Sequence, residues 1–253
     1  MYKKNKKRKK IILSVIGILL VVIAAGVVRY LTFFMKADEE AVAAMASIDR
    51  VSVEEDDKYI TFTPTDNNLA TAMVYYPGGQ VEPESFAYAA RSIAEHGYTF
   101  IIAKMPFNLA MFDYNEAKNI VKNHDEIENW YLSGFSLGGV AACMTLSKDE
   151  TPFKGLVLYA SYTTDNYDLK DSSLRVKSIS ASNDGLATAD KIEKGKRYLP
   201  ENTEYFEIKG GNHTQFAIYG DGEIQKGDNK ADIDRMKQQD ILVEETLKFM
   251  NGN

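Results

Sequence analysis

The alternation of apolar and polar positions divides this chain into two parts near residue 50. The first part contains one long apolar run, from Ile11 to Val28, which carries no charged side chain. The second part contains short apolar runs that are bounded by turn residues and separated by segments with helical periodicity. The pattern therefore predicts one isolated apolar helix, followed by a globular domain of mixed strands and helices.

The globular part, residues 50–253, is predicted to begin with two strands joined by the turn Glu55–Asp57. The predicted strands are Arg50–Glu54, Lys58–Pro64, Ala70–Tyr76, Tyr98–Lys104, Trp130–Ser133, Gly155–Ala160, Arg175–Ser180 and Thr203–Ile208. The predicted helices are Glu84–Glu95, Tyr114–Lys122, Leu137–Ser147, Leu186–Tyr198 and Ile233–Met250. This alternation favours an α/β fold with a mostly parallel sheet that helices cover on both faces. Ligands of such a sheet bind beyond the carboxyl ends of its strands.

The apolar run near the N-terminus is long enough to cross a bilayer, at about 27 Å for a helix that rises about 1.5 Å per residue. We interpret residues 1–10 as a basic cytoplasmic tail, 11–35 as a transmembrane anchor and 36–49 as a short helical or flexible spacer. Ala24–Gly26 could instead be the cleavage site of a secretory signal, but the apolar character continues past it. A single-pass anchor in the cell membrane is therefore favoured, with the domain outside the cytoplasm.

Charge is distributed unevenly between the two parts. Residues 1–36 hold nine Lys or Arg and no acidic residue, so the other 217 residues carry 21 basic and 36 acidic side chains, a formal charge of −15. Such an acidic domain argues against a nucleic-acid partner. The single cysteine, Cys143, cannot form an intrachain disulfide, and it is interpreted as a small buried residue.

The stretch from Gly134 to Gly138 reads Gly-Phe-Ser-Leu-Gly and lies between a predicted strand and a predicted helix. This is the pattern of a nucleophile elbow, a strained turn that presents a serine and leaves no room for side chains at the flanking glycines. A glycine-rich turn without chemistry is the alternative, but the strand before Ser136 and the small-residue helix after it favour the elbow. Ser136 is therefore the candidate nucleophile.

A serine hydroxyl needs an imidazole to accept its proton and a carboxylate to orient that imidazole. Asp184 and His213 each follow a predicted strand, and the chain order Ser, Asp, His is the one found in α/β hydrolases. Asp184 could be a plain Asp-Gly turn, in which case Asp165 or Asp168 would be the acid. The other two histidines, at positions 96 and 124, end predicted helices, so His213 is the candidate base.

The site also needs backbone N–H groups that stabilise negative charge on the substrate oxygen. One would come from Leu137, directly after the serine. The glycine-rich loop after the strand that ends at Tyr76 would supply the second, from Gly79 by preference or from Gln80. A simple turn after the strand is the alternative for this loop.

These stretches together resemble a bacterial α/β hydrolase of the small, lidless type known as the alpha/beta hydrolase fold-5 family. The resemblance covers about residues 50–250 and rests on Tyr76–Val81, Ala103–Asn108, Gly134–Gly139, Ser182–Leu186 and Gly210–Phe216. It implies Ser136 as nucleophile, Asp184 as acid and His213 as base, and it implies ester-like substrates only loosely. Pro77 stands where lipases with a His-Gly motif have histidine, which leaves the second oxyanion donor less defined.

About 14 residues separate the predicted strands that end at Ala160 and begin at Arg175, too few for a large helical lid. The loop 216–228 after the histidine is read as a solvated loop, with a mobile flap as the alternative. Its acids do not match a calcium-binding loop, and neither a metal nor another cofactor is predicted. The expected activity is hydrolysis of a small or polymer-borne carboxylic ester; an acyltransferase and a non-catalytic binding module are the alternatives.

Overall fold

The computed structural model describes residues 2–252, without the side chains of residues 2–9, 11, 31 and 32. The chain forms two compact units, Met1–Phe34 and Met35–Asn253. The first unit is the helix α1 (Tyr2–Thr32), whose segment Ile12–Tyr30 has a mean hydropathy of 2.7 and exposes its side chains along its whole length. By length and composition this helix can cross a membrane. The side chains of the lysine cluster at residues 3–9 lie outside the described residues.

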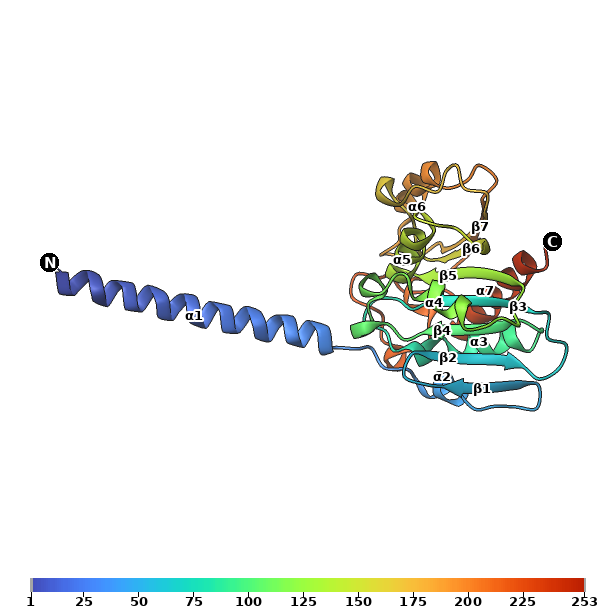
Figure 1. Ribbon diagram of the computed structural model, residues 1–253, viewed down its shortest axis with the longest axis horizontal. Coiled ribbons are helices and arrows are strands. Elements are labelled where there is room, and N and C mark those ends of the chain that lie inside the picture. Colours follow the sequence, from blue (N-terminus) through green and yellow to red (C-terminus); the bar gives the residue numbers. More distant parts are fainter. Residues whose placement is uncertain (1, 253) are drawn as a thin grey trace. The chain divides into compact units, whose positions relative to one another are not determined.

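The second unit is built on one eight-stranded sheet, with strand order β1-β2-β4-β3-β5-β6-β7-β8 (Figure 1). The strands are β1 (Val51–Glu55), β2 (Tyr59–Pro64), β3 (Thr71–Tyr76), β4 (Thr99–Ala103), β5 (Asn129–Phe135), β6 (Phe153–Tyr159), β7 (Arg175–Ala181) and β8 (Glu204–Ile208). The ladders β1–β2 and β2–β4 are antiparallel, and the six strands from β4 to β8 are parallel. The predicted α/β fold with a mostly parallel sheet is confirmed.

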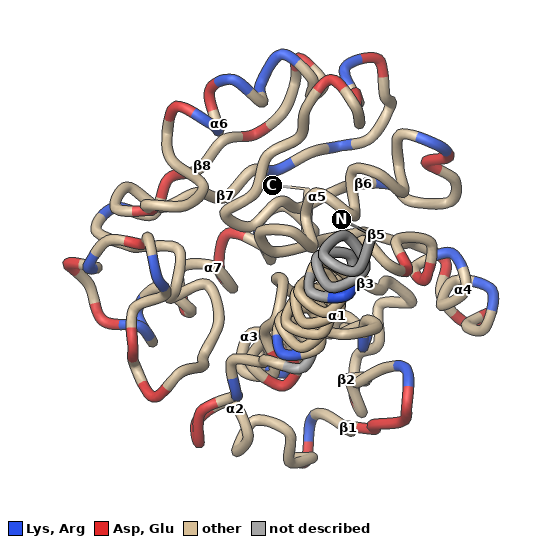
Figure 2. The backbone as a smooth tube through the Cα atoms, turned by 90° about the vertical axis from the view of Figure 1, so that its left-hand side faces the viewer, with Lys and Arg blue, Asp and Glu red and all other residues tan. Residues whose placement is uncertain are grey.

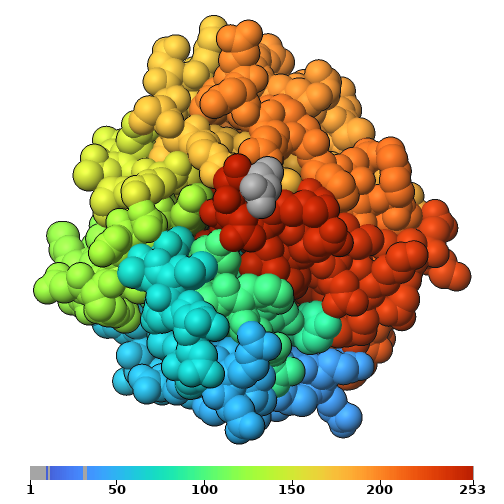
Figure 3. Space-filling view, turned by 90° about the vertical axis from the view of Figure 1, so that its right-hand side faces the viewer, coloured from blue at the N-terminus to red at the C-terminus, as the bar shows by residue number. Residues whose placement is uncertain are grey.

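Helices cover both faces of the sheet, and each face has its own hydrophobic core. The helices are α2 (Glu39–Ala43), α3 (Ala87–Ala94), α4 (Glu116–Lys122), α5 (Leu137–Leu146), α6 (Ala189–Gly195) and α7 (Arg235–Met250). Ile93 of α3 and Phe249 of α7 belong to one core, whereas Ile120 of α4 and Ala142 of α5 belong to the other. The contact of α3 with α7 is visible in Figure 3, where the red C-terminal residues border the green segment. Every residue of β3 is buried, as expected for a central parallel strand.

Short 3₁₀ turns replace parts of the predicted helices and connect other elements. They span Pro83–Phe86, Pro106–Asn108, Ala110–Phe112, Asp165–Tyr167, Lys196–Tyr198, Thr214–Phe216 and Gly220–Gly222. The predicted helix Glu84–Glu95 begins with such a turn, and the predicted helix Leu186–Tyr198 is α6 followed by one. Helix α7 begins after Asp234, whose side chain accepts a hydrogen bond from the Met236 N–H. This is an N-cap, which fixes where the helix starts.

Residues 36–49, expected to be a spacer, contain α2 and pack within the second unit. Ala41 and Ala44 are fully buried, and the buried carboxylate of Asp38 forms an ion pair with Arg235 at the start of α7. Charged residues of both signs are interspersed around the outer loops and helices of this unit (Figure 2). The packing of α2 comes from small alanine side chains, which allow its backbone to approach the domain closely.

Candidate active site

Ser136 lies between the end of β5 and the start of α5, with a φ of 52°. A side chain on Gly134 would place its Cβ 2.6 Å from the Gly139 nitrogen, and one on Gly138 would place it 2.6 Å from the Tyr76 carbonyl carbon. Neither position has space for a side chain, so glycine is required on both sides of the serine. The strained φ of Ser136 and these close approaches are the geometry of a nucleophile elbow.

The backbone of Ser136 is held from the neighbouring strand. Its N–H donates to the Tyr159 carbonyl at 3.0 Å, and its own carbonyl accepts a hydrogen bond from the Ser161 hydroxyl at 2.8 Å. Ser161 is buried and also limits the space beside Gly139. The turn that carries the hydroxyl is therefore fixed at both its N–H and its carbonyl, which supports the unfavourable φ.

His213 and Asp184 meet although they are 29 residues apart. The imidazole Nδ1 lies 2.8 Å from Asp184 Oδ2, and both side chains are almost completely buried. The other carboxylate oxygen of Asp184 accepts the N–H groups of Leu186 and Ala187, each at 2.7 Å. The carboxylate is thus held by the main chain and directs one oxygen at the imidazole, the arrangement that fixes the tautomer of a catalytic histidine.

Two further elements restrain His213. Its ring lies against the ring of Phe135, the residue before the serine, with centroids 4.7 Å apart. Gln238 of α7 is fully buried, donates to the Asn212 carbonyl at 2.8 Å and accepts the Asn212 N–H at 3.0 Å. The turn before His213 is therefore tied to α7, and the imidazole is packed on the elbow itself.

Ser136 and His213 line the same small cavity of about 100 Å³. The other lining residues are Leu137, Val140, Ala160, Ser161, Tyr162, Leu186 and Ala187. The three predicted residues thus come together at the carboxyl ends of β5, β7 and β8. A hydroxyl, an imidazole and a buried carboxylate in this order can activate the hydroxyl as a nucleophile.

The loop after β3 lies against the start of α5. A Cβ on Gly79 would meet the side chain of Leu137 at 2.6 Å, so the two proposed oxyanion donors belong to neighbouring segments. The Leu137 N–H is the first of α5, where helix N–H groups have no acceptor within the helix. The Gln80 N–H, in contrast, already donates to the Asn108 carbonyl at 2.8 Å. Gly79 is accordingly the more suitable second donor, because an amide that is already hydrogen-bonded cannot also serve an oxyanion.

The alternative acids and the other histidines lie apart from this cluster. Asp165 and Asp168 are exposed, and Asp168 accepts the N–H of Lys170 within its own turn. His96 contacts the Ser92 carbonyl, one turn earlier in the chain, and His124 pairs with Glu126. Each is bonded locally rather than to the serine turn.

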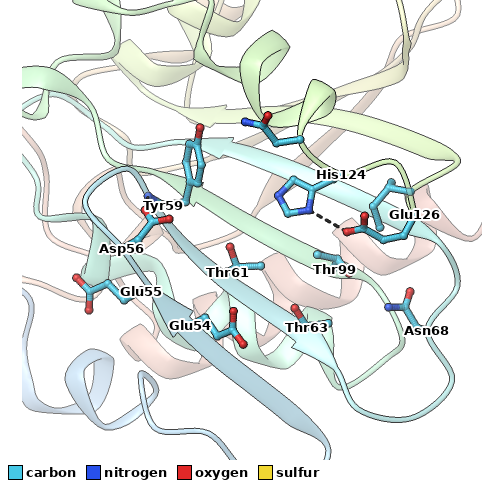
Figure 4. A pocket seen from close by; sticks show the side chains of 12 residues that line it. Glu54, Glu55, Asp56, Tyr59, Thr61, Thr63, Asn68, Thr99, His124 and Glu126 are labelled. Atoms are coloured by element: carbon cyan, nitrogen blue, oxygen red, sulfur yellow. Dashed lines mark hydrogen bonds and ion pairs between the residues drawn. The ribbon is translucent and has the colours of Figure 1, made fainter.

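A larger cavity of about 550 Å³ lies at the antiparallel edge of the sheet (Figure 4). Glu54, Glu55 and Asp56 border one side of it, and the His124–Glu126 pair borders the other. Its floor is formed by threonines of β2 and β4, on strands that do not carry Ser136 or His213. Size alone does not identify the reactive site, because the chemistry requires the serine and the imidazole together.

Several contributors to the site have no local sequence signal. Asp228, in the loop after the histidine, accepts hydrogen bonds from Gly185 and Thr214, the residues that follow Asp184 and His213. Leu137 is exposed beside the serine, and Phe107 and Phe112 form an exposed aromatic pair in the neighbouring loop, with centroids 5.9 Å apart. The hydrogen bonds of Asp228 join residues that are distant in sequence. The contact between Phe107 and Phe112 depends on the conformation of their loop.

The single cysteine of the chain lies in the helix that follows Ser136. Cys143 of α5 is completely buried, and burial raises the pKa of its thiol to about 12, so it is protonated at neutral pH. Within the described residues, no group of three or more His, Cys, Asp or Glu side chains is arranged to hold a metal ion.

Comparison with known proteins identifies the family and the fold. A family model described as "Alpha/beta hydrolase family" matches residues 72–240. The chain is similar to a CIB-like hydrolase from Thermoplasma acidophilum, with a TM-score of 0.57 and 12% identity over 80% of this chain and 100% of that one. It is also similar to Est1E from Butyrivibrio proteoclasticus, with a TM-score of 0.55 and 13% identity over the same shares. A comparison with curated proteins gave no match.

Proposed function

Because the chain belongs to the alpha/beta hydrolase family, we propose that it is a membrane-anchored serine hydrolase that acts on carboxylic esters. The observation that carries the proposal is the 2.8 Å contact of His213 Nδ1 with Asp184 Oδ2, made by an imidazole that lines one cavity with Ser136. Family membership alone does not give the reaction, since one fold hosts many chemistries. The combination of nucleophile, base and buried acid favours acyl transfer through a serine ester.

In the proposed reaction the Ser136 Oγ attacks the ester carbonyl carbon while His213 Nε2 takes the hydroxyl proton. The N–H groups of Leu137 and Gly79 stabilise the negative charge that develops on the carbonyl oxygen. The alcohol leaves with the proton that His213 returns, and an acyl group remains on Ser136. Water, deprotonated by the same imidazole, then releases the acid and restores the serine.

The size of the cavity favours a short acyl group. A volume of about 100 Å³ is small beside the roughly 300–1,000 Å³ of ordinary small-molecule pockets. Val140, Ala160 and Ala187 line it and supply apolar contacts for such a group. Longer acyl chains would have to extend over the surface, so esters of short acids should be the better substrates.

The proposal is tested on the full-length protein in detergent with a fluorophosphonate probe and a panel of esters that differ in acyl length. Wild-type protein should be labelled and should hydrolyse short-acyl esters fastest. Ser136→Ala should lose labelling and should lose turnover by a factor on the order of 10⁴ or more, with the fold retained. Labelling that persists in this variant would overturn the assignment of Ser136.

The same panel separates the alternative activities. Esters formed in the presence of added alcohols, instead of free acid, would identify an acyltransferase that uses the same acyl-enzyme. Wild-type protein that neither reacts with the probe nor hydrolyses any ester of the panel would contradict an enzyme of this mechanism and leave a binding role for the cavity.

A further inference from the structure

The loop after His213 first leaves the site and then returns to it. Residues 218–221 run beside the beginning of the second unit, where the Asp38 N–H donates to the Ile218 carbonyl and the Asp221 N–H donates to Asp38 Oδ1. The chain then turns back, and Asp228 lies beside the turns that follow β7 and β8. This course agrees with the expected solvated loop, because most side chains from 221 to 230 are exposed. Its two ends, however, are firmly bonded.

Asp228 forms hydrogen bonds with both turns that carry the acid and the base. Its Oδ2 accepts the N–H of Thr214 at 2.8 Å and the hydroxyl of Thr214 at 2.7 Å. Its Oδ1 accepts the N–H of Gly185 at 2.9 Å. Gly185 directly follows Asp184, and Thr214 directly follows His213. One carboxylate therefore joins the main chains next to the two residues that must stay 2.8 Å apart.

The fit between these segments is close. A Cβ on Gly185 would lie 2.5 Å from the Gly227 carbonyl oxygen and 3.0 Å from the Cα of Asp228, so only glycine lets the two loops approach in this way. The Thr214 hydroxyl donates to Asp228 and accepts the N–H of Gln225 at 3.0 Å. The returning loop is thus attached to the histidine turn at two places.

We propose that Asp228 is a positioning residue that fixes the distance between the Asp184 turn and the His213 turn. This inference rests on the proposed function, because it concerns the alignment of that acid with that base. Both turns follow the ends of neighbouring strands. The Asn183 N–H joins them before the acid and the base, by donating to the Gly211 carbonyl, and Asp228 joins them after these residues. Displacement of a catalytic group by about 1 Å can lower a rate by about 100-fold, so a bond that joins the two turns affects turnover directly.

The role is indirect, since the partners of the Asp228 carboxylate within the described residues are the N–H groups of Gly185 and Thr214 and the Thr214 hydroxyl. The cavity shared by Ser136 and His213 is lined by other residues, so a change at Asp228 should leave substrate binding nearly intact. A carboxylate suits the position because it is an acceptor at both oxygens, whereas an amide would place a donor opposite one of the N–H groups. The expected signature is therefore a lower kcat with little change in KM.

The test compares Asp228→Ala with wild type, both full-length, with rates normalised to the folded fraction. We expect kcat, and the rate of fluorophosphonate labelling, to fall by about 10- to 100-fold, with KM changed by less than about twofold. Hydrogen exchange at the amides of Gly185 and Thr214 should become faster, because both lose their acceptor. Asp149→Ala is the control: Asp149 also accepts hydrogen bonds from a main-chain N–H and a lysine, but it lies in the loop before β6, at the amino ends of the parallel strands.

A double-variant measurement distinguishes positioning from a general loss of stability. In an Asp184→Asn background the productive contact of a carboxylate with the imidazole is already lost, so adding Asp228→Ala should lower kcat by less than about twofold. Thr214→Ser, which keeps the hydroxyl, should retain activity, whereas Thr214→Val should lose part of it. Thr214→Val also serves as the milder probe if Asp228→Ala does not fold.

Two results would overturn the inference: wild-type kcat in folded Asp228→Ala, or an equal loss of kcat in the wild-type and Asp184→Asn backgrounds. The second result would identify Asp228 as a structural residue only. Failure of the proposed function gives a different outcome: either wild type is inactive on the whole ester panel, or Ser136→Ala and Asp184→Asn retain activity. The two hypotheses can therefore be rejected separately.

Discussion

His213 has the most restricted side chain of the site, because its ring, its Nδ1 and its preceding main chain are each held by a different element. Asp184 contacts Nδ1, Phe135 packs against the ring, and Gln238 bonds to Asn212. A ring held in this way keeps one orientation and one tautomer. The protein, and not the substrate, therefore sets the direction in which Nε2 points. The loss of any one restraint should affect turnover more than binding.

The assignment of the acid is tested by replacing Asp184 with asparagine. Asp184→Asn should lower turnover by a factor on the order of 10⁴, because the amide can donate to Nδ1 and stabilise the wrong tautomer. Steady-state kinetics of the purified variants measure the effect. Asp165→Asn and Asp168→Asn are matched controls on the preceding loop and should keep activity. Loss of activity in Asp165→Asn, with Asp184→Asn active, would reverse the assignment.

The pH dependence of the reaction tests the role of His213. The imidazole must be neutral to accept the serine proton, and a protonated imidazole cannot act as a base. Activity should therefore be lost as the pH falls and retained as the pH rises. A pH–rate profile of kcat/KM with a short-acyl ester measures this. A rate that does not change between about pH 5 and 8 would argue against His213 as the base.

The sequence was sufficient to propose Ser136, Asp184 and His213 as candidates, because each lies in a short local pattern at the end of a predicted strand. Asp228 and Ser161 could not be found in the same way. Their bonds to Gly185, Thr214 and Ser136 join segments that are distant in the chain, and an aspartate in a polar loop gives no local signal. Only the pairing of strands brings those partners together.

At the scale of elements, the elbow depends on the approach of α5 to the loop after β3. This approach is possible because Gly138 has no side chain where it meets the carbonyl groups of Tyr76 and Pro77. The parallel pairing of β5 with β6 also explains why β5 extends to Phe135, two residues beyond its predicted end at Ser133. Each of its residues from Tyr131 to Phe135 is paired with β6, so the strand continues up to the turn.

Gly138→Ala should disrupt the elbow. The added Cβ would overlap the Tyr76 carbonyl group, and neither backbone can move without shifting Ser136 or the proposed Gly79 donor. We expect a clear loss of activity together with a lower melting temperature, measured by thermal unfolding and ester hydrolysis. Gly220→Ala, whose Cβ would meet nothing within 4 Å, is the control and should cost only about 1–2 kcal/mol for its positive φ. Normal activity in Gly138→Ala would show that the turn is more adaptable than these contacts indicate.

Some predicted boundaries of helices and strands differ from those in the structure. They belong to elements whose ends are fixed by side-chain hydrogen bonds or by backbone turns. The predicted helix Leu186–Tyr198 begins only after Thr188, whose carbonyl accepts the N–H groups of Lys191 and Ile192. Leu186 and Ala187 instead form a turn in which their N–H groups donate to Asp184. Hydrophobic periodicity does not report such bonds. The strands, whose runs are bounded by turn residues, were predicted within a few residues.

At the scale of the whole molecule, the apolar helix and the acidic domain suit different environments. The segment Ile12–Tyr30 is apolar and long enough to span a membrane, and residues 37–253 carry a formal charge of −15. Hydropathy made the helix recognisable from sequence. The packing of residues 36–49 into the domain was not recognisable, because two buried alanines and one buried aspartate do not form a distinctive pattern.

Alkaline carbonate extraction tests whether this helix is retained as an anchor. The full-length chain should stay in the membrane fraction, because a continuous apolar helix of this length is stable only in lipid. Protease added outside intact cells should digest the domain if the basic end lies in the cytoplasm. A mature protein whose N-terminus lies near Ala25 or Gly26, recovered in the soluble fraction, would show a cleaved signal instead.

The contacts of residues 35–38 with the domain determine where the chain can be cut to obtain a soluble enzyme. They include the ion pair between Asp38 and Arg235. Met35 donates its N–H to the Gln80 carbonyl, and the Glu82 N–H donates to the Met35 carbonyl, so the first residues after α1 support the loop that contains Gly79. A protease that cuts just before Met35 would release a domain with this support intact. A fragment that begins at residue 50 would lack the Met35 contacts and the partner of Arg235. The loop that contains Gly79 would then lose its two hydrogen bonds to Met35.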